Sequence, residues 1–150
     1  MLQFGAHAFV WVGAWTPEDG DRAIRQAAET GFDFIELPLL SPETFHAERH
    51  RDTLRAAGIE ATCSLILPEH AHMPEAPEAA KDFLLRVLDK MEVLGSSYLA
   101  GCIGYHLGRL TGQPPQPEER RTVERVLREV AQDARARGVT LALEACNRYE

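Results

Sequence analysis

Residues 139–150 read VTLALEACNRYE, an apolar run that ends with two carboxylates and an arginine. With the two-residue period of a strand, Thr140, Ala142 and Glu144 form a row of small residues ending in an acid, opposite a row of large apolar residues. An unpaired carboxylate in an apolar interior is costly. Glu144 on an inward face is therefore expected to meet a metal, a cation or a substrate proton; otherwise the strand simply reaches solvent there.

The rest of the chain alternates between β-rich runs and amphipathic helices. Helices are expected to begin near a Thr-Pro-Glu-Asp and a Ser-Pro-Glu segment, and to stop at Gly31, Gly58, Gly95 and Gly138. The expected strands cover residues 2–10, 32–37, 60–67 and 98–103, and the expected helices cover 16–30, 41–57, 83–94 and 123–134. Such βα repeats indicate a parallel sheet with right-handed crossovers.

Two architectures satisfy this pattern, the open doubly wound sheet and the (β/α)8 TIM barrel. No GxGxxG segment follows the first expected strand, which removes the main sign of a dinucleotide-binding sheet. Glu36 and Glu144 end two strands, and long loops follow the third and fourth, as in a barrel whose active site lies at the strand ends. A whole barrel takes about 250 residues. We therefore expect residues 1–150 to be the N-terminal part of a single TIM-barrel domain, about half: four βα units plus strand five.

Composition excludes several classes of protein. A net charge of −7 and a pI near 5.4 argue against nucleic-acid binding, which needs a basic face. No apolar run approaches the roughly 20 residues of a membrane span, and the N-terminus lacks the features of a signal peptide, so we expect a cytoplasmic protein. Cys63, Cys102 and Cys146 have no CxxC spacing and are expected to be small buried residues.

Three segments carry a resemblance to a known family. Residues 31–36 (GFDFIE), 99–101 (LAG) and 141–150 (LALEACNRYE) resemble the tagatose/psicose (allulose) 3-epimerases, within the xylose-isomerase-like superfamily. The last segment is the specific one, because an aliphatic strand, Glu, two residues and Asn-Arg-aromatic-Glu is close to that family's motif. The first is shared by many members of the superfamily and indicates the fold more than the activity.

The resemblance implies a ketose 3-epimerase that uses a divalent metal. Glu144 would be a metal ligand and one of two glutamates that exchange a proton at C3 of a free ketose. Glu150 would hydrogen-bond substrate hydroxyls near the metal. By position, the sugar pocket would also include Trp15, His7, Ser64 and Cys102. The aspartate, histidine and second glutamate that complete the family's metal site belong to later strands and are not in this chain.

The residue types agree with that reaction. The C3 hydrogen beside a ketose carbonyl is weakly acidic, so the resulting ene-diolate must be stabilised, and carboxylates on opposite faces can remove and return the proton. Hard oxygen donors with a histidine favour Mn²⁺, with Co²⁺ or Mg²⁺ as alternatives. The expected partners are a small sugar and further copies of the chain, in a dimer or tetramer, with no nucleic acid and no membrane.

Other candidates have more ordinary interpretations. His106 follows the fourth strand and is a candidate substrate contact. His46 and His50 lie on what reads as a solvated helix face, Trp15 is as easily a packing residue, and Glu36 is expected to support the site.

Three functional hypotheses therefore remain. The first is a ketose 3-epimerase, inactive as the isolated 150 residues because one ligand of four cannot hold the metal. The second is another sugar isomerase or dehydratase on the same scaffold, such as a hydroxypyruvate isomerase, inosose dehydratase or sugar-phosphate epimerase. The third is a non-catalytic half-barrel that pairs its open sheet edges with a second copy.

Overall fold

A single parallel sheet organises the protein. The computed structural model describes residues 2–109, 111–114 and 116–146. The strands are β1 (Gly5–His7), β2 (Phe34–Pro38), β3 (Glu60–Ile66), β4 (Tyr98–Cys102) and β5 (Thr140–Leu143). They lie in sequence order, β1-β2-β3-β4-β5, and every neighbouring pair is parallel. A doubly wound sheet reverses its strand order, so this unbroken order confirms the first half of a (β/α)8 barrel.

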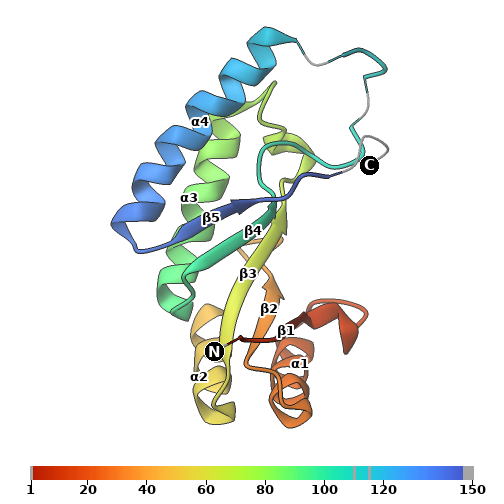
Figure 1. Ribbon diagram of the computed structural model, residues 1–150, viewed down its shortest axis with the longest axis vertical. Coiled ribbons are helices and arrows are strands. Elements are labelled where there is room, and N and C mark those ends of the chain that lie inside the picture. The colour runs from red at the N-terminus through yellow and green to blue at the C-terminus, as the bar shows by residue number, and fades with distance from the viewer. Residues whose placement is uncertain (1, 110, 115, 147–150) are drawn as a thin grey trace.

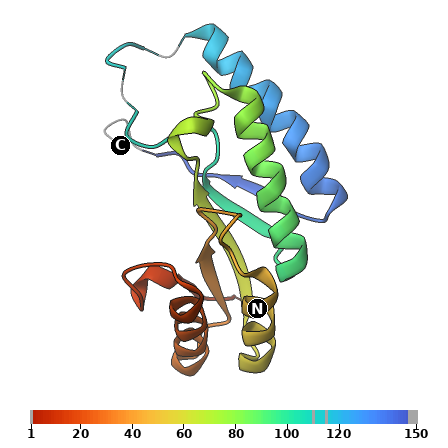
Figure 2. The ribbon, with the colours of Figure 1, turned by 180° about the vertical axis from the view of Figure 1, so that it is seen from behind.

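The helices cover one face of the sheet. They are α1 (Pro17–Thr30), α2 (Ala47–Ala57), α3 (Pro77–Leu94) and α4 (Pro117–Ala136), with short 3₁₀ turns η1 (Ala8–Val10) and η2 (Glu69–Ala71). Figure 1 shows the strands in front of the helices, and the reverse view in Figure 2 places the helices in front. The opposite face of the sheet, which lines the interior of a whole barrel, is left open.

Local sequence signals set the ends of α1 as expected. The Thr16 hydroxyl accepts a hydrogen bond from the Asp19 N–H at 3.1 Å, Pro17 occupies the first turn, and Gly31 ends the helix with a left-handed φ of 90°. This combination satisfies backbone groups that a helix end otherwise leaves unpaired.

Two predicted elements were placed wrongly. The first strand is only Gly5–His7, because the His7 Nδ1 accepts the Phe9 N–H at 3.1 Å and turns the chain into η1. Helix α2 begins at Ala47 and not near Ser41, where the Thr44 N–H bonds to the Ser41 carbonyl and closes a turn. That turn brings Phe45 into the core, so burial of an aromatic ring overrides a local helix-start signal.

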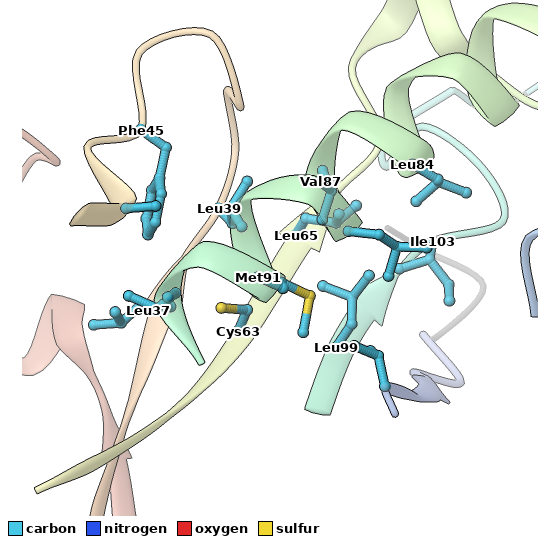
Figure 3. Close-up of a cluster of buried hydrophobic side chains, with 14 of the residues drawn as sticks. Leu37, Leu39, Phe45, Cys63, Leu65, Leu84, Val87, Met91, Leu99 and Ile103 are labelled. Atoms are coloured by element: carbon cyan, nitrogen blue, oxygen red, sulfur yellow. The ribbon is translucent and has the colours of Figure 1, made fainter. Parts of the chain in front are cut away.

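The core lies between the sheet and the helices. Figure 3 shows Leu84, Val87 and Met91 of α3 over Leu65 of β3 and Leu99 of β4. All five side chains are at most 2% exposed. Alternate strand residues that point the other way are partly open, as Ile66 illustrates at 39% exposed. The sheet therefore has one closed face and one accessible face.

Gly101 fixes the carboxyl end of β4. Its φ is +105°, and a Cβ added there would lie 2.2 Å from the Leu65 carbonyl oxygen. Only glycine tolerates both this conformation and this approach. The backbone therefore passes close to β3 immediately before Cys102, whose side chain is 2% exposed.

Candidate active site

A pocket of about 460 Å³ opens on the accessible face at the carboxyl edge of the sheet. Every strand contributes to it, as expected for the site of a βα barrel. Pro38, Ser64, Ala100 and Ala142 are paired across β2 to β5, which makes them one inward-facing layer. The pocket's polar side chains are those of His7, Glu36, Ser64 and Glu144. The structure therefore brings together His7, Ser64 and Glu144, three of the expected site residues, with Glu36, which was expected to support the site.

Glu144 follows directly on β5. Its backbone N–H donates to the Gly101 carbonyl oxygen at 3.1 Å, which ties the residue to the end of β4. Its side chain is exposed at the pocket, and within the described part of the chain its carboxylate makes no hydrogen bond or ion pair. Such an open carboxylate fits a hard divalent cation or a substrate proton. The role of Glu144 as a metal ligand stays a prediction.

His7 and Glu36 form a second polar pair at the ends of β1 and β2. The His7 Nε2 lies 3.8 Å from the Glu36 Oε1, and both side chains are about one-third exposed. Because the His7 Nδ1 accepts the Phe9 N–H, the proton of a neutral ring belongs on Nε2, facing Glu36. At 3.8 Å the two groups form an ion pair only when His7 is protonated, so the supporting role expected of Glu36 stays a prediction.

Cys102 lies beside Glu144, at the end of β4. Its Sγ, a Glu144 carboxylate oxygen and the Cys146 Sγ all lie within 4.8 Å of one another. Tyr105 borders this group: a hydrogen bond with Cys146, burial, and the nearby Cys102 and Glu144 raise the pKa of its hydroxyl to about 12. Cys146 was expected only to be a small buried residue, yet it is half-exposed. The sequence signal that could have placed Cys146 beside Glu144 was its position two residues further along the chain.

Cys102 and two other predicted pocket residues lie outside the lining of the carboxyl-edge pocket. Trp15 stacks on Phe45 with ring centroids 6.1 Å apart and also contacts the ring of His50 at 5.2 Å, so its observed contacts are those of a packing residue. The His106 Nδ1 lies 2.7 Å from the Leu67 carbonyl oxygen, and the His106 backbone N–H donates to the His72 Nδ1 at 3.1 Å, which links the loops after β3 and β4. Their substrate contacts stay predictions. Glu150 lies outside the described residues.

The interpretation of His50 as a solvated surface residue was wrong. Its side chain is 1% exposed, and its Nδ1 lies 3.3 Å from the Asp21 Oδ1. Asp21 also accepts bonds from Arg49 at 2.7 Å and Thr53 at 2.9 Å. The cause is the turn before α2, which brings Phe45 and His50 against Trp15 and α1. This network lies in the helical layer, away from the pocket.

Apolar side chains around the pocket were also missed. Phe9, Leu40, Ile66 and Leu143 line it and are between 39% and 60% exposed. Each lies near a strand end, where the two-residue pattern breaks down. A larger pocket, about 730 Å³, lies beside α4 and the loop before it, but it includes no strand residue. The carboxyl-edge pocket is therefore the candidate active site.

The chain is similar to known 3-epimerases over almost all of its length. The chain is 32% identical over 153 residues to the L-ribulose 3-epimerase of Methylomonas sp. (strain DH-1) and 28% identical over 153 residues to the ketose 3-epimerase of Arthrobacter globiformis. Each alignment covers 99% of this chain and 53% of the relative. A crystal structure of the D-allulose 3-epimerase from Methylomonas sp. in complex with D-allulose superposes with a TM-score of 0.93 at 31% identity, over 99% of this chain and 53% of that one.

The chain thus spans about half the length of the relatives it matches. Among the helices that the structure describes, none is long and apolar enough to cross a membrane. The sequence model of the xylose isomerase-like TIM barrel family matches residues 24–150, starting within α1. Sheet order, the pocket at the strand ends and this match agree, and the chain belongs to the xylose isomerase-like TIM barrel family.

Proposed function

We propose that the complete protein is a metal-dependent ketose 3-epimerase, which removes and returns the C3 proton of a free ketose. One observation carries the proposal: the open carboxylate of Glu144 at the carboxyl edge of β5, in a pocket to which all the strands contribute. The relatives support it, because the proteins similar over 99% of this chain are named ketose and L-ribulose 3-epimerases. The substrate class is a free ketohexose or ketopentose.

Glu144 has two roles in this proposal. Its carboxylate is a ligand for a divalent cation, Mn²⁺ before Co²⁺ or Mg²⁺, and it exchanges the proton at C3. When bound, the ion would supply Lewis-acid stabilisation of the negative charge that develops on the substrate oxygens. The hydrogen bond from the Glu144 N–H to the Gly101 carbonyl anchors the backbone of Glu144, which helps to position the carboxylate for both roles.

The neighbouring residues orient the sugar. The Ser64 hydroxyl and the imidazole of His7 line the same pocket and offer hydrogen bonds to sugar hydroxyls. Glu36 holds the His7 ring from the side away from Phe9. The exposed apolar side chains at the strand ends, such as Phe9 and Leu143, exclude water from the reacting carbons.

The described residues offer Glu144 as the one hard ligand at the carboxyl edge of β5. A stable site for such an ion takes several oxygen or nitrogen ligands. We therefore propose that residues 1–150 alone show no turnover, and that the complete barrel is the active unit.

The test uses the complete protein with Glu144→Gln, which keeps the shape of the side chain but removes its charge. Chromatography measures inversion at C3 for a panel of ketoses. Chelation of the metal should abolish this activity, and added Mn²⁺ or Co²⁺ should restore it. Glu144→Gln should reduce it about 10³-fold or more. Glu60→Gln is the matched control, because Glu60 is an exposed carboxylate at the opposite end of the sheet. Full activity of the Glu144 variant rules the proposal out, and formation of an aldose or a dehydrated product instead of the C3 epimer reassigns the reaction.

A further inference from the structure

Cys102, Glu144 and Cys146 form a cluster whose chemistry differs from that of a hard-metal site. Cys102 ends β4, and the other two residues follow β5. Their two sulfur atoms and one carboxylate oxygen lie within 4.8 Å of one another. Two potential thiolates and one carboxylate are a soft, anionic donor set, which favours Zn²⁺ and other thiophilic cations over Mg²⁺ or Mn²⁺.

The backbone holds these donors together. The close passage of Gly101 against Leu65 sets the position of Cys102, and the Glu144 N–H bonds to the carbonyl of the same glycine. Cys102 is buried, Cys146 is half-exposed and Glu144 is exposed, so the cluster opens toward solvent on one side. An ion can therefore reach the cluster from the side of Glu144, which lines the pocket, while Cys102 and Glu144 are anchored at the ends of the adjacent parallel strands β4 and β5.

The separations suit a tetrahedral ion. Zn–S bonds of about 2.3 Å place two sulfur ligands roughly 3.8 Å apart. The three donor atoms in the structure are at most 4.8 Å apart, which is within about 1 Å of that separation. Small side-chain rotations are enough to close the difference. Three protein ligands leave a fourth position for water, and the Tyr105 hydroxyl beside Cys146 is placed to contact an outer ligand.

We propose that Cys102, Glu144 and Cys146 bind Zn²⁺ in a site distinct from the hard-metal site of the epimerase reaction. The two sites share Glu144, so Zn²⁺ held by the cysteines removes that carboxylate from catalysis. This inhibitory consequence rests on the proposed function, whereas the binding itself rests only on the three side chains. Binding deprotonates both thiols and releases the protons to solvent.

Cobalt(II) is the probe, because it replaces zinc in tetrahedral sites and its bonds to thiolates absorb light. The purified chain, kept reduced with a phosphine, is titrated with Co²⁺ and then with Zn²⁺. We expect a thiolate-to-cobalt absorption band at one equivalent and its loss when Zn²⁺ displaces cobalt. Cys146→Ser should remove most of the band and weaken Zn²⁺ binding at least about tenfold.

Matched variants keep the test decisive. Cys102→Ser alters a buried position and is assessed only if it folds, whereas the half-exposed Cys146 carries the test independently. Cys63→Ala is the control, because Cys63 is fully buried on the helix-covered face and should leave the band unchanged. An absent band, or one retained in Cys146→Ser, overturns the site. Either result leaves the epimerase proposal standing, because that proposal is tested by turnover of a ketose. The cobalt band in turn reports metal binding by the thiols whether or not the protein is an epimerase.

Discussion

Two carboxylates of this protein have opposite surroundings. Asp21, in the helical layer, is 8% exposed and is bonded by Arg49, His50 and Thr53. Glu144, at the carboxyl edge of the sheet, is exposed, and within the described residues its side chain has no hydrogen bond or ion pair. Burial raises the pKa of Asp21, but the bonds from Arg49, Thr53 and His50 outweigh it, so the pKa lies below its usual value of 3.8.

The difference separates stabilising residues from reactive ones. A buried carboxylate with all its bonds made within the protein has little capacity left for a ligand. A carboxylate left open in a pocket contributes little to folding and is available to a metal or substrate. The helical layer therefore holds the carboxylate that stabilises the half-barrel, and the carboxyl edge of the sheet holds the one that is proposed to react.

The largest expected effect compares adjacent residues of β3. Leu65 faces the helices at 2% exposure, whereas Ile66 faces the pocket at 39%. Leu65→Ala should cost about 3 kcal/mol of unfolding free energy, because it leaves a cavity in the core. Ile66→Ala should cost less than about 1 kcal/mol, because much of the side chain already contacts water. Urea unfolding measures both, and equal losses would contradict the division into a closed and an open face.

The next contrast concerns the two carboxylates themselves. Asp21→Asn should destabilise the protein by about 2 kcal/mol, because it weakens the bonds of Arg49 and leaves buried polar groups poorly paired. Glu144→Gln should change stability by less than about 0.5 kcal/mol, because the Glu144 carboxylate makes no bond to the residues that the structure describes. Thermal unfolding of both variants checks the pair. A clear loss of stability in the Glu144 variant would show that this carboxylate is structural.

The smallest effect is a dependence of stability on pH. Burial lowers the pKa of His50 below 6.5 more than Asp21 raises it. The Nδ1–H donates to Asp21, and the Nε2 is buried without a partner among the described residues, so a second proton has no acceptor. Because the unfolded chain takes up protons more readily, stability should fall as the pH drops from about 6.5 toward the folded pKa of His50.

The paired variants His50→Gln and His46→Gln isolate this contribution. His46 precedes the same helix but is exposed. Denaturant unfolding between neutral and mildly acid pH should show a clearly shallower pH dependence for His50→Gln, and a much smaller change for His46→Gln, because the charge of His46 is a minor cause of the lowered pKa of His50. Burial also lowers the pKa of His72, so some dependence remains in both variants. If the dependence of stability on pH is the same in His50→Gln as in the unsubstituted protein, then protonation of His50 does not destabilise the fold and this prediction is wrong.

The order of strands and helices could be predicted from the sequence because local chemistry carries it. Thr16 and Pro17 begin α1, Gly31 ends it, and apolar spacing marks α3, all signals that lie within a few residues of one another. The inward row of Thr140, Ala142 and Glu144 likewise follows from the alternation of a strand. These features were confirmed because no distant contact had to be known.

The composition of the site was only partly predictable. Sequence and resemblance named His7, Ser64 and Glu144, which share one pocket, and Cys102, which lies beside Glu144 but outside the lining of that pocket. They did not connect Cys146 with Cys102, because these residues lie 44 positions apart and meet only where β4 and β5 pair. They also left His50 on the surface, because its partner Asp21 belongs to another helix.

The sequence by itself thus determined the βα repeat, the helix ends and the acid at the end of β5, since each depends on neighbours along the chain. Tertiary structure alone decided which face of the sheet is closed, which carboxylate is bonded and which is open, and which side chains surround Glu144. Those properties arise from burial and distance between segments far apart in sequence, where free energy depends on what packs against a side chain and not on what precedes it.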